Sequence, residues 1–263
     1  MAADLFTLLI PSRRPLPIVA NLPHSGLHVP EEVAAQFTPE HLRSLPHSDW
    51  HLQELYSFLP SIGITVLQAN YSRYVIDLNR ALKPPFFGSF WSAAVAETTA
   101  FKQPVYARKP SPEDVRSRIN EYYTPYHQKL TQLLNEKIDQ FGQVYLLDLH
   151  SFLGLIPDDV CLGNANGQTC TARFINQVSE SFTQQGYQAV QNKVFSGGYI
   201  TRHYGQQPLV EALQIELRYP LYLSDDQIET EAIPTWQSEK FAQAKARLQR
   251  IFESFCSASS FAR

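Results

Sequence analysis

Two histidines that follow apolar stretches of the sequence are the first candidates for chemistry. His24 comes soon after the apolar residues 16–22, and His150 comes soon after residues 144–147. Two imidazoles and one carboxylate, with a fourth position open, are the usual ligands of catalytic zinc in hydrolases. Zinc held in this way activates water and polarises a carbonyl group. The residue types therefore suggest a hydrolase that uses zinc or another divalent metal, although ligands this scattered make a weak motif.

Asp49 is the carboxylate that we expect to complete the ligand set. His51 lies two residues further along a predicted helix, and positions i and i+2 of a helix do not share a face. At most one of the two binds the metal, so His51 is expected beside the site or at the surface. Taken alone, Asp49 has a simpler interpretation, because a carboxylate in the first turn of a helix complements the helix dipole.

Asp148 and His150 are expected to point the same way, because a strand carries side chains i and i+2 on one face. In that position Asp148 orients a metal-binding histidine through its free ring nitrogen. An isolated pair of this spacing is also typical of an ordinary hydrogen-bonded pair at the end of a core strand.

Glu216 is the best candidate for a general base. It lies in a predicted strand, on the same face as Gln214 and Arg218. A carboxylate beside activated water accepts its proton and passes it to the leaving amine. The alternative for Glu216 is an ion pair with Arg218 or Arg202 at the strand end.

Several arginines follow predicted strands and suggest an anionic small-molecule substrate. Arg binds carboxylates through two parallel hydrogen bonds. Asn79 and Arg80, at a predicted strand end, are expected to anchor such a group. Arg73 or Arg202 is expected to polarise the amide oxygen or to hold a second carboxylate. For any one of these arginines, a surface salt bridge is the alternative.

The predicted elements place these side chains at one edge of a sheet. Strands alternating with helices predict an α/β fold with a mixed, mostly parallel central sheet flanked by helices, and ligands of open α/β sheets bind at the carboxyl ends of the strands. Strands are predicted at residues 16–22, 63–69, 74–79, 144–147, 159–163, 187–194 and 212–219. Helices are predicted after Pro39, at 49–56 with Ser48 as N-cap, at 111–142 with a kink at Pro125, at 170–185 and at 238–256. Residues 83–103 are predicted to form a lid or short hairpin over a site, and residues 195–205 a loop.

Composition excludes several classes of function. The chain has 263 residues and a net charge of −3, with no basic run, so binding to nucleic acid or to a membrane surface has no electrostatic support. Three cysteines are too few for a disulfide framework, and the apolar run at residues 6–10 is too short for a secretory signal or a membrane span. We expect a cytoplasmic protein with one domain over residues 1–263.

The sequence also resembles a known family, the N-formylglutamate amidohydrolases, also called N-formylglutamate deformylases. The blocks that carry the resemblance occur in order, between about residue 18 and residue 220. They are Leu22-Pro23-His24-Ser25-Gly26, Ser48-Asp49-Trp50-His51, residues 72–80, Leu147-Asp148-Leu149-His150-Ser151, Cys161-Leu162-Gly163-Asn164, Gly197-Gly198-Tyr199-Ile200-Thr201 and Gln214-Ile215-Glu216-Leu217.

The resemblance implies a fold like that of zinc carboxypeptidases and a reaction that releases formate from N-formyl-L-glutamate during histidine degradation. It implies His24, Asp49 and His150 as metal ligands and Glu216 as the base. It also implies that Asn79-Arg80 is similar to the pair that binds a substrate carboxylate in those peptidases. Asp77 and Asp148 are expected next to the ligands but outside the ligand set.

One stretch departs from the pattern of the family. The usual Gly-Asp-Arg-x-Gly after the strand that contains Cys161 is here Gly163-Asn164-Ala165-Asn166-Gly167, without the acid and the arginine. If this loop contacts the substrate, we expect the acyl group or the amino-acid side chain to differ from that of N-formylglutamate. Two other readings remain: a carboxypeptidase-like or other N-acyl-amino-acid amidohydrolase, and a non-catalytic module that binds carboxylates.

Overall fold

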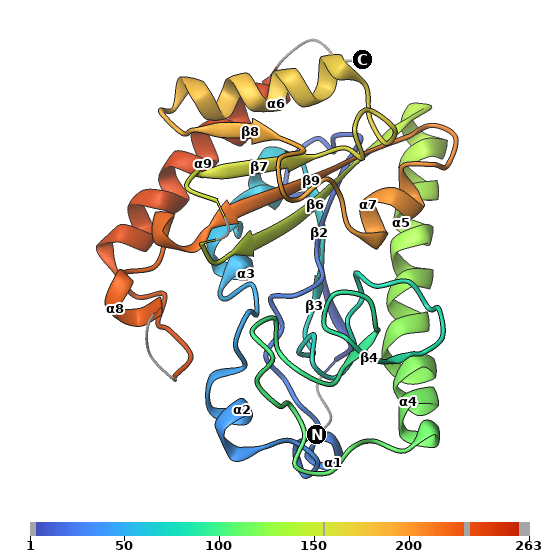
Figure 1. The fold of residues 1–263 in the computed structure, drawn as a ribbon. Helices are drawn as coiled ribbons and strands as arrows, with labels where there is room; N and C mark the ends of the chain where they lie inside the picture. The colour runs from blue at the N-terminus through green and yellow to red at the C-terminus, as the bar shows by residue number, and fades with distance from the viewer. Residues whose placement is uncertain (1–3, 155, 229–231, 258–263) are drawn as a thin grey trace.

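The central sheet of the protein has seven strands among the residues described by a computed structural model, namely 4–154, 156–228 and 232–257. The strand order is β1-β3-β2-β6-β9-β7-β8 (Figure 1). The strands are β1 (Phe6–Leu9), β2 (Ile18–Leu22), β3 (Thr65–Ala69), β6 (Val144–Phe152), β7 (Val160–Gly163), β8 (Ala189–Gln191) and β9 (Val210–Arg218). β3, β2, β6 and β9 run parallel, whereas β1 and β7 pair antiparallel with β3 and β9. The predicted mixed, mostly parallel sheet is confirmed.

Helices cover both faces of this sheet, as Figure 1 shows. One face packs against α3 (Leu52–Leu55), α6 (Ala172–Gln184) and α9 (Glu239–Ser257). The other packs against α4 (Pro112–Arg118), a π-helical turn (Ile119–Tyr123), α5 (Thr124–Phe141) and α7 (Tyr199–Tyr204). Buried residues of β6 alternate between the two cores, with Tyr145 and Leu147 in the first and Val144 and Leu146 in the second. No helix in the described part of the chain has the length and apolar character that a bilayer crossing requires.

This alternation brings the polar side chains of β6 and β9 together. Asp148 and His150 follow Val144 and Leu146 in the strand period, so they belong to the face covered by α5 and α7. Strand pairing sets Asp148 opposite Gln214 and His150 opposite Glu216. The expectation that Asp148 and His150 share a face is confirmed, because the two side chains contact each other.

The predicted strand at residues 74–79 is wrong. These residues form turns, although all six are buried and four of them are apolar. Asp77 Oδ1 accepts a hydrogen bond from the backbone N–H of Asn79, and the backbone N–H of Val75 bonds to Ser72 O. Such local side-chain bonds compete with a strand ladder. The apolar residues here pack into the cores from an irregular segment.

The N-cap predicted at Ser48 is also wrong. The helical region divides into α2 (Pro39–Ser44) and α3, and α3 begins after His51, which has left-handed backbone angles. Asp49 therefore precedes the helix and lies outside its first turn. By contrast, Ser111 caps α4 in a capping box with Asp114, and the helix changes to a π-helical turn just before Pro125.

The predictions for two irregular segments need correction. Residues 83–103 contain a parallel pair, β4 (Phe87–Gly88) and β5 (Val95–Ala96), so they do not form a hairpin. The predicted loop at 195–205 contains helix α7. Short elements that the sequence did not reveal are α1 (Glu31–Ala34), α8 (Asp225–Ile228), 3-10 turns at Leu59–Ile62 and Tyr219–Leu221, and strand β1.

Candidate active site

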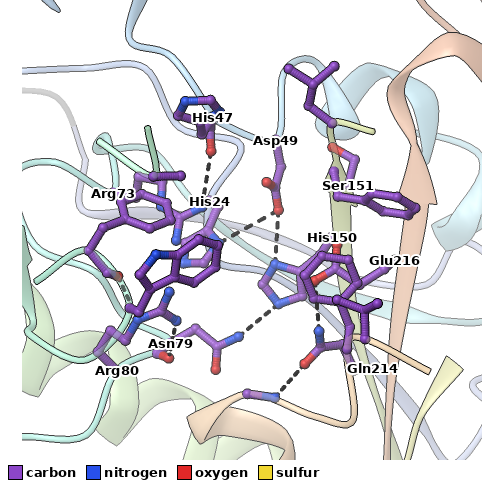
Figure 2. A pocket seen from close by; sticks show the side chains of 18 of the residues that line it. His24, His47, Asp49, Arg73, Asn79, Arg80, His150, Ser151, Gln214 and Glu216 are labelled. Carbon is purple, nitrogen blue, oxygen red and sulfur yellow. Dashed lines mark hydrogen bonds and ion pairs between the residues drawn. The ribbon is translucent and has the colours of Figure 1, made fainter. Parts of the chain in front are cut away.

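Two imidazoles and one carboxylate converge where β2 and β6 reach their carboxyl ends. His150 Nδ1 lies 2.9 Å from Asp49 Oδ2, and His24 Nδ1 lies 3.7 Å from the same oxygen. All three ligand atoms lie within 4.8 Å of one another, and all three residues are buried. Figure 2 shows Asp49 pointing between the two rings. A hydrogen bond from the backbone N–H of Asp49 to His24 O holds the loop that carries Asp49 against the end of β2.

The Nε2 atom of each ring faces a carboxylate. His24 Nε2 lies 2.7 Å from Asp77 Oδ1, and His150 Nε2 lies 3.0 Å from Asp148 Oδ1. A carboxylate accepts a hydrogen bond from Nε2–H, and in the neutral imidazole this tautomer leaves the Nδ1 lone pair free for a cation. Asp77 and Asp148 therefore lie next to the cluster of His24, Asp49 and His150, at the places where they fix both rings.

Hydrogen bonding and charge set the protonation of the cluster. Burial alone would raise the pKa of Asp49, but its hydrogen bonds with His150 and His24 outweigh burial, so its pKa lies below the usual value. Burial alone would lower the pKa of His150, but Asp148 and Asp49 hold it well above the usual value. The cluster thus already attracts positive charge at the point where the Nδ1 atoms meet Asp49.

The charge count of the site fits a divalent cation. Four carboxylates are buried here, and two guanidinium groups, those of Arg73 and Arg80, face them. The carboxylates are Asp49, Asp77, Asp148 and Glu216. Buried charges require compensation. With both imidazoles neutral, as metal binding requires, and all four carboxylates ionised, an ion of charge +2 balances the excess of two negative charges. Two imidazole nitrogens and one carboxylate oxygen suit Zn²⁺ best among common divalent ions.

Glu216 lies beside this cluster on β9, in register with His150. Its Oε1 atom accepts a hydrogen bond of 2.7 Å from Gln214 Nε2. Burial, together with the nearby charge of Asp49 and against that of His150, raises its pKa to about 7. The alternative ion pairs do not form: Arg218 donates to Pro157 O, and Arg202 donates to Gly197 O. Figure 2 shows Glu216 next to His150 and Gln214.

Arg73 and Arg80 both line the pocket above the cluster. Arg73 donates to Asp77 Oδ2 at 2.6 Å and to His47 O at 3.0 Å, and its buried Nε has no partner among the described residues. Arg80 donates to Asn79 O and to Phe90 O. Both guanidinium groups therefore keep N–H groups available for an anionic ligand.

Asn79 joins the arginine segment to the metal cluster. Its Oδ1 accepts from the backbone N–H of Ile200 at the start of α7, and its Nδ2 lies 3.0 Å from His150 Nε2. Gly198 is required beside it, because a Cβ at that position would lie 2.4 Å from Asn79 Nδ2. Asn79 thus acts as a bridge between three segments as well as a lining residue.

The structure does not bring two of the candidate residues into the pocket. Arg202 is absent from its lining, and the guanidinium of Arg202 is bound to Ser196 Oγ and Gly197 O. It supports the wall formed by residues 194–198 and is not placed to contact substrate. His51 is turned to Pro234 O at 2.6 Å.

The pocket over the cluster has a volume of about 380 Å³, and several of its lining residues were not singled out in the sequence. They are His47, Phe90, Trp91, Phe101, Ser151, Phe152, Val194, Phe195, Gln214 and Tyr219. Gln214 was detectable, since it shares a strand face with Glu216. Phe90, Trp91 and Phe101 lie in the segment predicted to cover a site, and the structure places that segment at the pocket.

The altered loop at residues 164–167 does not line the pocket. Asn164 Oδ1 accepts from the backbone N–H of Gly167 and from Asn192 Nδ2, and the backbone N–H of Ala165 bonds to Ser196 O. Asn164 therefore stabilises a turn behind the wall formed by residues 194–198. Ala165 and Asn166 adopt left-handed backbone angles in that turn.

Comparison with known proteins decides the family. The model of the N-formylglutamate amidohydrolase family matches residues 16–223, which include the residues of the cluster and Glu216. The chain belongs to this family. An N-formylglutamate deformylase of Pseudomonas putida is 34% identical over 224 residues, covering 80% of this chain and 83% of the relative. A second, from Pseudomonas aeruginosa, is 32% identical over 222 residues, with the same coverage of both chains.

Solved structures show the same relationship. The N-formylglutamate amidohydrolase of Ralstonia eutropha is similar over 98% of both chains, with a TM-score of 0.82 and 29% identity. A gene product of Agrobacterium tumefaciens shares the fold, with a TM-score of 0.70 and 15% identity over 97% of this chain and 96% of that one. The family and its fold are therefore shown for this chain.

Proposed function

We propose that the protein is a metal-dependent amidohydrolase that removes the acyl group, in the first place formyl, from an N-acyl amino acid. One observation carries this proposal: one ligand atom from each of His24, Asp49 and His150 lies within 4.8 Å of the others, in a pocket that Glu216 and two arginines also line. N-formyl-L-glutamate, the substrate class that the names of the relatives give, is the reference substrate. Its products are formate and L-glutamate.

His24, Asp49 and His150 would hold the metal, and Asp77 and Asp148 would keep both imidazoles in the tautomer that binds it. When bound, a divalent cation lowers the pKa of water and polarises the amide carbonyl. The donor set favours zinc. The three ligands come from segments that the sheet and the His24–Asp49 backbone bond hold together, so the site is largely formed before the metal binds.

Glu216 would move the proton of the reaction. It accepts a proton from the attacking water as the water oxygen bonds to the acyl carbon, and it delivers this proton to the amine nitrogen as the C–N bond breaks. A pKa raised to about 7 suits both steps near neutral pH. Gln214 orients the carboxylate by donating to Oε1, which leaves the other oxygen for water.

Arg80 would bind the carboxylate of the substrate, and Arg73 would donate to the amide oxygen. Both guanidinium groups lie over the ring of Phe90. The distance from the ring centroid to the Cζ atom is 4.6 Å for Arg73 and 5.8 Å for Arg80. The unpartnered Nε–H of Arg73 supports this role, because a buried donor without an acceptor is costly until a ligand satisfies it. Asn79 keeps Arg80 next to the metal cluster, because its Nδ2 donates to Asp148 Oδ2 and its Oδ1 accepts from the backbone N–H of Ile200.

Parallel assays test the proposal. Zinc-loaded protein is supplied with N-formyl-L-glutamate, N-acetyl-L-aspartate and a short peptide, and amine release is followed for each. The proposal predicts turnover of the formyl amino acid, with the others at least tenfold slower. Peptide cleavage as the main activity would favour a carboxypeptidase-like enzyme. Tight binding of N-formyl-L-glutamate without release of formate would favour a carboxylate-binding module. A place in histidine degradation and a cytoplasmic location remain predictions.

A further inference from the structure

Large apolar side chains surround the mouth of the active-site pocket. Trp91, Phe101 and Val194 line it and are 56%, 60% and 46% exposed. We call these three residues the apolar rim. Exposed apolar surface gathered at one place is unfavourable in water unless a ligand or partner covers it. Because the apolar rim belongs to the pocket that contains Glu216 and the metal cluster, the substrate is the natural cover.

The two arginines of the pocket lie together, and we call Arg73, Arg80 and Phe90 the arginine wall. Both contact the ring of Phe90, and both face Asp77 Oδ2, Arg73 at 2.6 Å and Arg80 at 4.0 Å. Asp77 neutralises one of the two positive charges. The wall therefore carries one net positive charge, which matches one carboxylate.

A second cation for a dicarboxylate substrate is lacking among the described residues that line the pocket. The remaining basic lining residue outside the metal cluster is His47, whose ring contacts the rings of Phe90 and Phe101 at centroid distances of 6.1 and 4.9 Å. Arg202 is bound to Ser196 and Gly197, away from the pocket. The carboxylate of an acidic side chain would therefore meet no second positive side chain, but apolar groups, neutral polar groups such as Ser151 and Ser196, or the carboxylate of Glu216.

The apolar rim lies next to the arginine wall. Trp91 follows Phe90 in sequence and contacts its ring edge-on at 5.2 Å. Phe101 contacts the ring of His47 at 4.9 Å, and His47 O accepts a hydrogen bond from Arg73. In an amino acid the carboxylate and the side chain leave the same Cα atom. A substrate whose carboxylate binds this wall therefore extends its side chain toward Trp91 and Phe101.

We propose that the pocket accepts N-formyl amino acids with a large apolar side chain and hydrolyses them with a kcat/KM at least equal to that for N-formyl-L-glutamate. The proposal rests on the proposed function and narrows its substrate class. The carboxylate of such a substrate binds Arg80, and its side chain covers the apolar rim. Water adds to the formyl carbon, the C–N bond breaks, and the products are formate and the free apolar amino acid.

The test compares N-formyl-L-phenylalanine with N-formyl-L-glutamate on the zinc-loaded protein. The ratio of their kcat/KM values is expected to be one or more, and the dissociation constants measured by calorimetry are expected to rank in the same order. A ratio below one overturns the inference and leaves the proposed function intact. If neither substrate is hydrolysed, the proposed function fails and the inference fails with it, an outcome distinct from turnover with a ratio below one.

Two variants test whether the side chain of the substrate binds at the apolar rim. Trp91→Ala combined with Phe101→Ala is expected to lower the ratio of kcat/KM for phenylalanine over glutamate by about tenfold, the scale of a few lost apolar contacts. Leu209→Ala is the matched control, since Leu209 is 58% exposed and lies just before β9, away from the pocket. It is expected to leave the ratio unchanged. An unchanged ratio in the double variant contradicts a side-chain site at the apolar rim.

Discussion

At the scale of single residues, His24 and His150 use the same ring nitrogen toward Asp49, and a carboxylate fixes each ring at the other nitrogen. The pair Asp148 and His150 was predictable, because the period of a strand places i and i+2 together. The contact of His24 with Asp77 was not, since it joins a strand end to a turn 53 residues away. The sequence also did not reveal that Arg202 stays outside the pocket, because this depends on hydrogen bonds to Ser196 Oγ and Gly197 O.

Glu216→Gln tests the proton transfer. The amide keeps the size of the side chain and the contact with Gln214 but cannot accept a proton, so kcat is expected to fall by about 10²–10⁴. Metal content, by elemental analysis, is expected to stay unchanged. Glu211→Gln is the control, because Glu211 lies on the same strand but binds Thr171 away from the pocket. Normal turnover by Glu216→Gln would remove Glu216 from the mechanism.

Asp148→Asn tests the orientation of His150. An asparagine side chain no longer stabilises the Nε2–H of His150 by charge, so zinc affinity is expected to fall by about 10- to 100-fold. A competition assay with a chromogenic chelator measures the change. Asp158→Asn serves as a control, since Asp158 forms a surface ion pair with Lys193. Equal zinc affinity in the two variants would show that Asp148 does not tune the ligand.

At the scale of elements, the long buried strands and the amphipathic helices were predictable, whereas the internal structure of the short and irregular segments around the pocket was not. Residues 74–79 have the composition of a strand, but Asp77 bonds to the backbone of Asn79 and turns the chain. Helix α7 is only six residues long, and it begins where Asn79 accepts from Ile200. Local bonds and tertiary partners decide such short elements, and neither produces a periodic pattern in the sequence.

Ser111→Ala tests how far local capping contributes to α4. Ser111 Oγ accepts from the backbone N–H of Asp114, and the carboxylate of Asp114 accepts from that of Ser111. Loss of this cap is expected to lower the free energy of unfolding by about 1 kcal/mol, measured by urea denaturation. Ser117→Ala, within the same helix, is expected to change it by much less. Equal stability of the two variants would contradict the role of the cap.

At the scale of the whole molecule, the sheet brings together residues from β6 and β9 and from the segments that follow β2 and β3. Alternation of strands and helices predicted these layers, and it predicted the edge at which polar side chains meet. The strand order and the antiparallel β1 and β7 were beyond reach, because they depend on long-range pairing. The apolar rim was hidden for the same reason, since its residues lie up to 103 positions apart in the sequence, from Trp91 to Val194.

Zinc is expected to stabilise the fold and to bind more tightly as the pH rises. A ligand that binds only the folded state raises the unfolding temperature. The pKa of His150 is held well above its usual value, so its proton must leave when the metal binds. Affinity should therefore increase by up to about tenfold per pH unit below that pKa. Calorimetric titration at pH 6 and pH 8 in non-coordinating buffers measures this dependence; affinity independent of pH would contradict it.

The most direct test of the account is the metal content of the purified protein, measured together with formate release from N-formyl amino acids. We predict about one zinc ion per chain, loss of formate release with a chelator, and recovery when zinc is returned. His150→Ala should lose both metal and activity while the protein remains folded. Full activity in protein stripped of metal, or full metal content in His150→Ala, would contradict the claim that His24, Asp49 and His150 hold a catalytic cation.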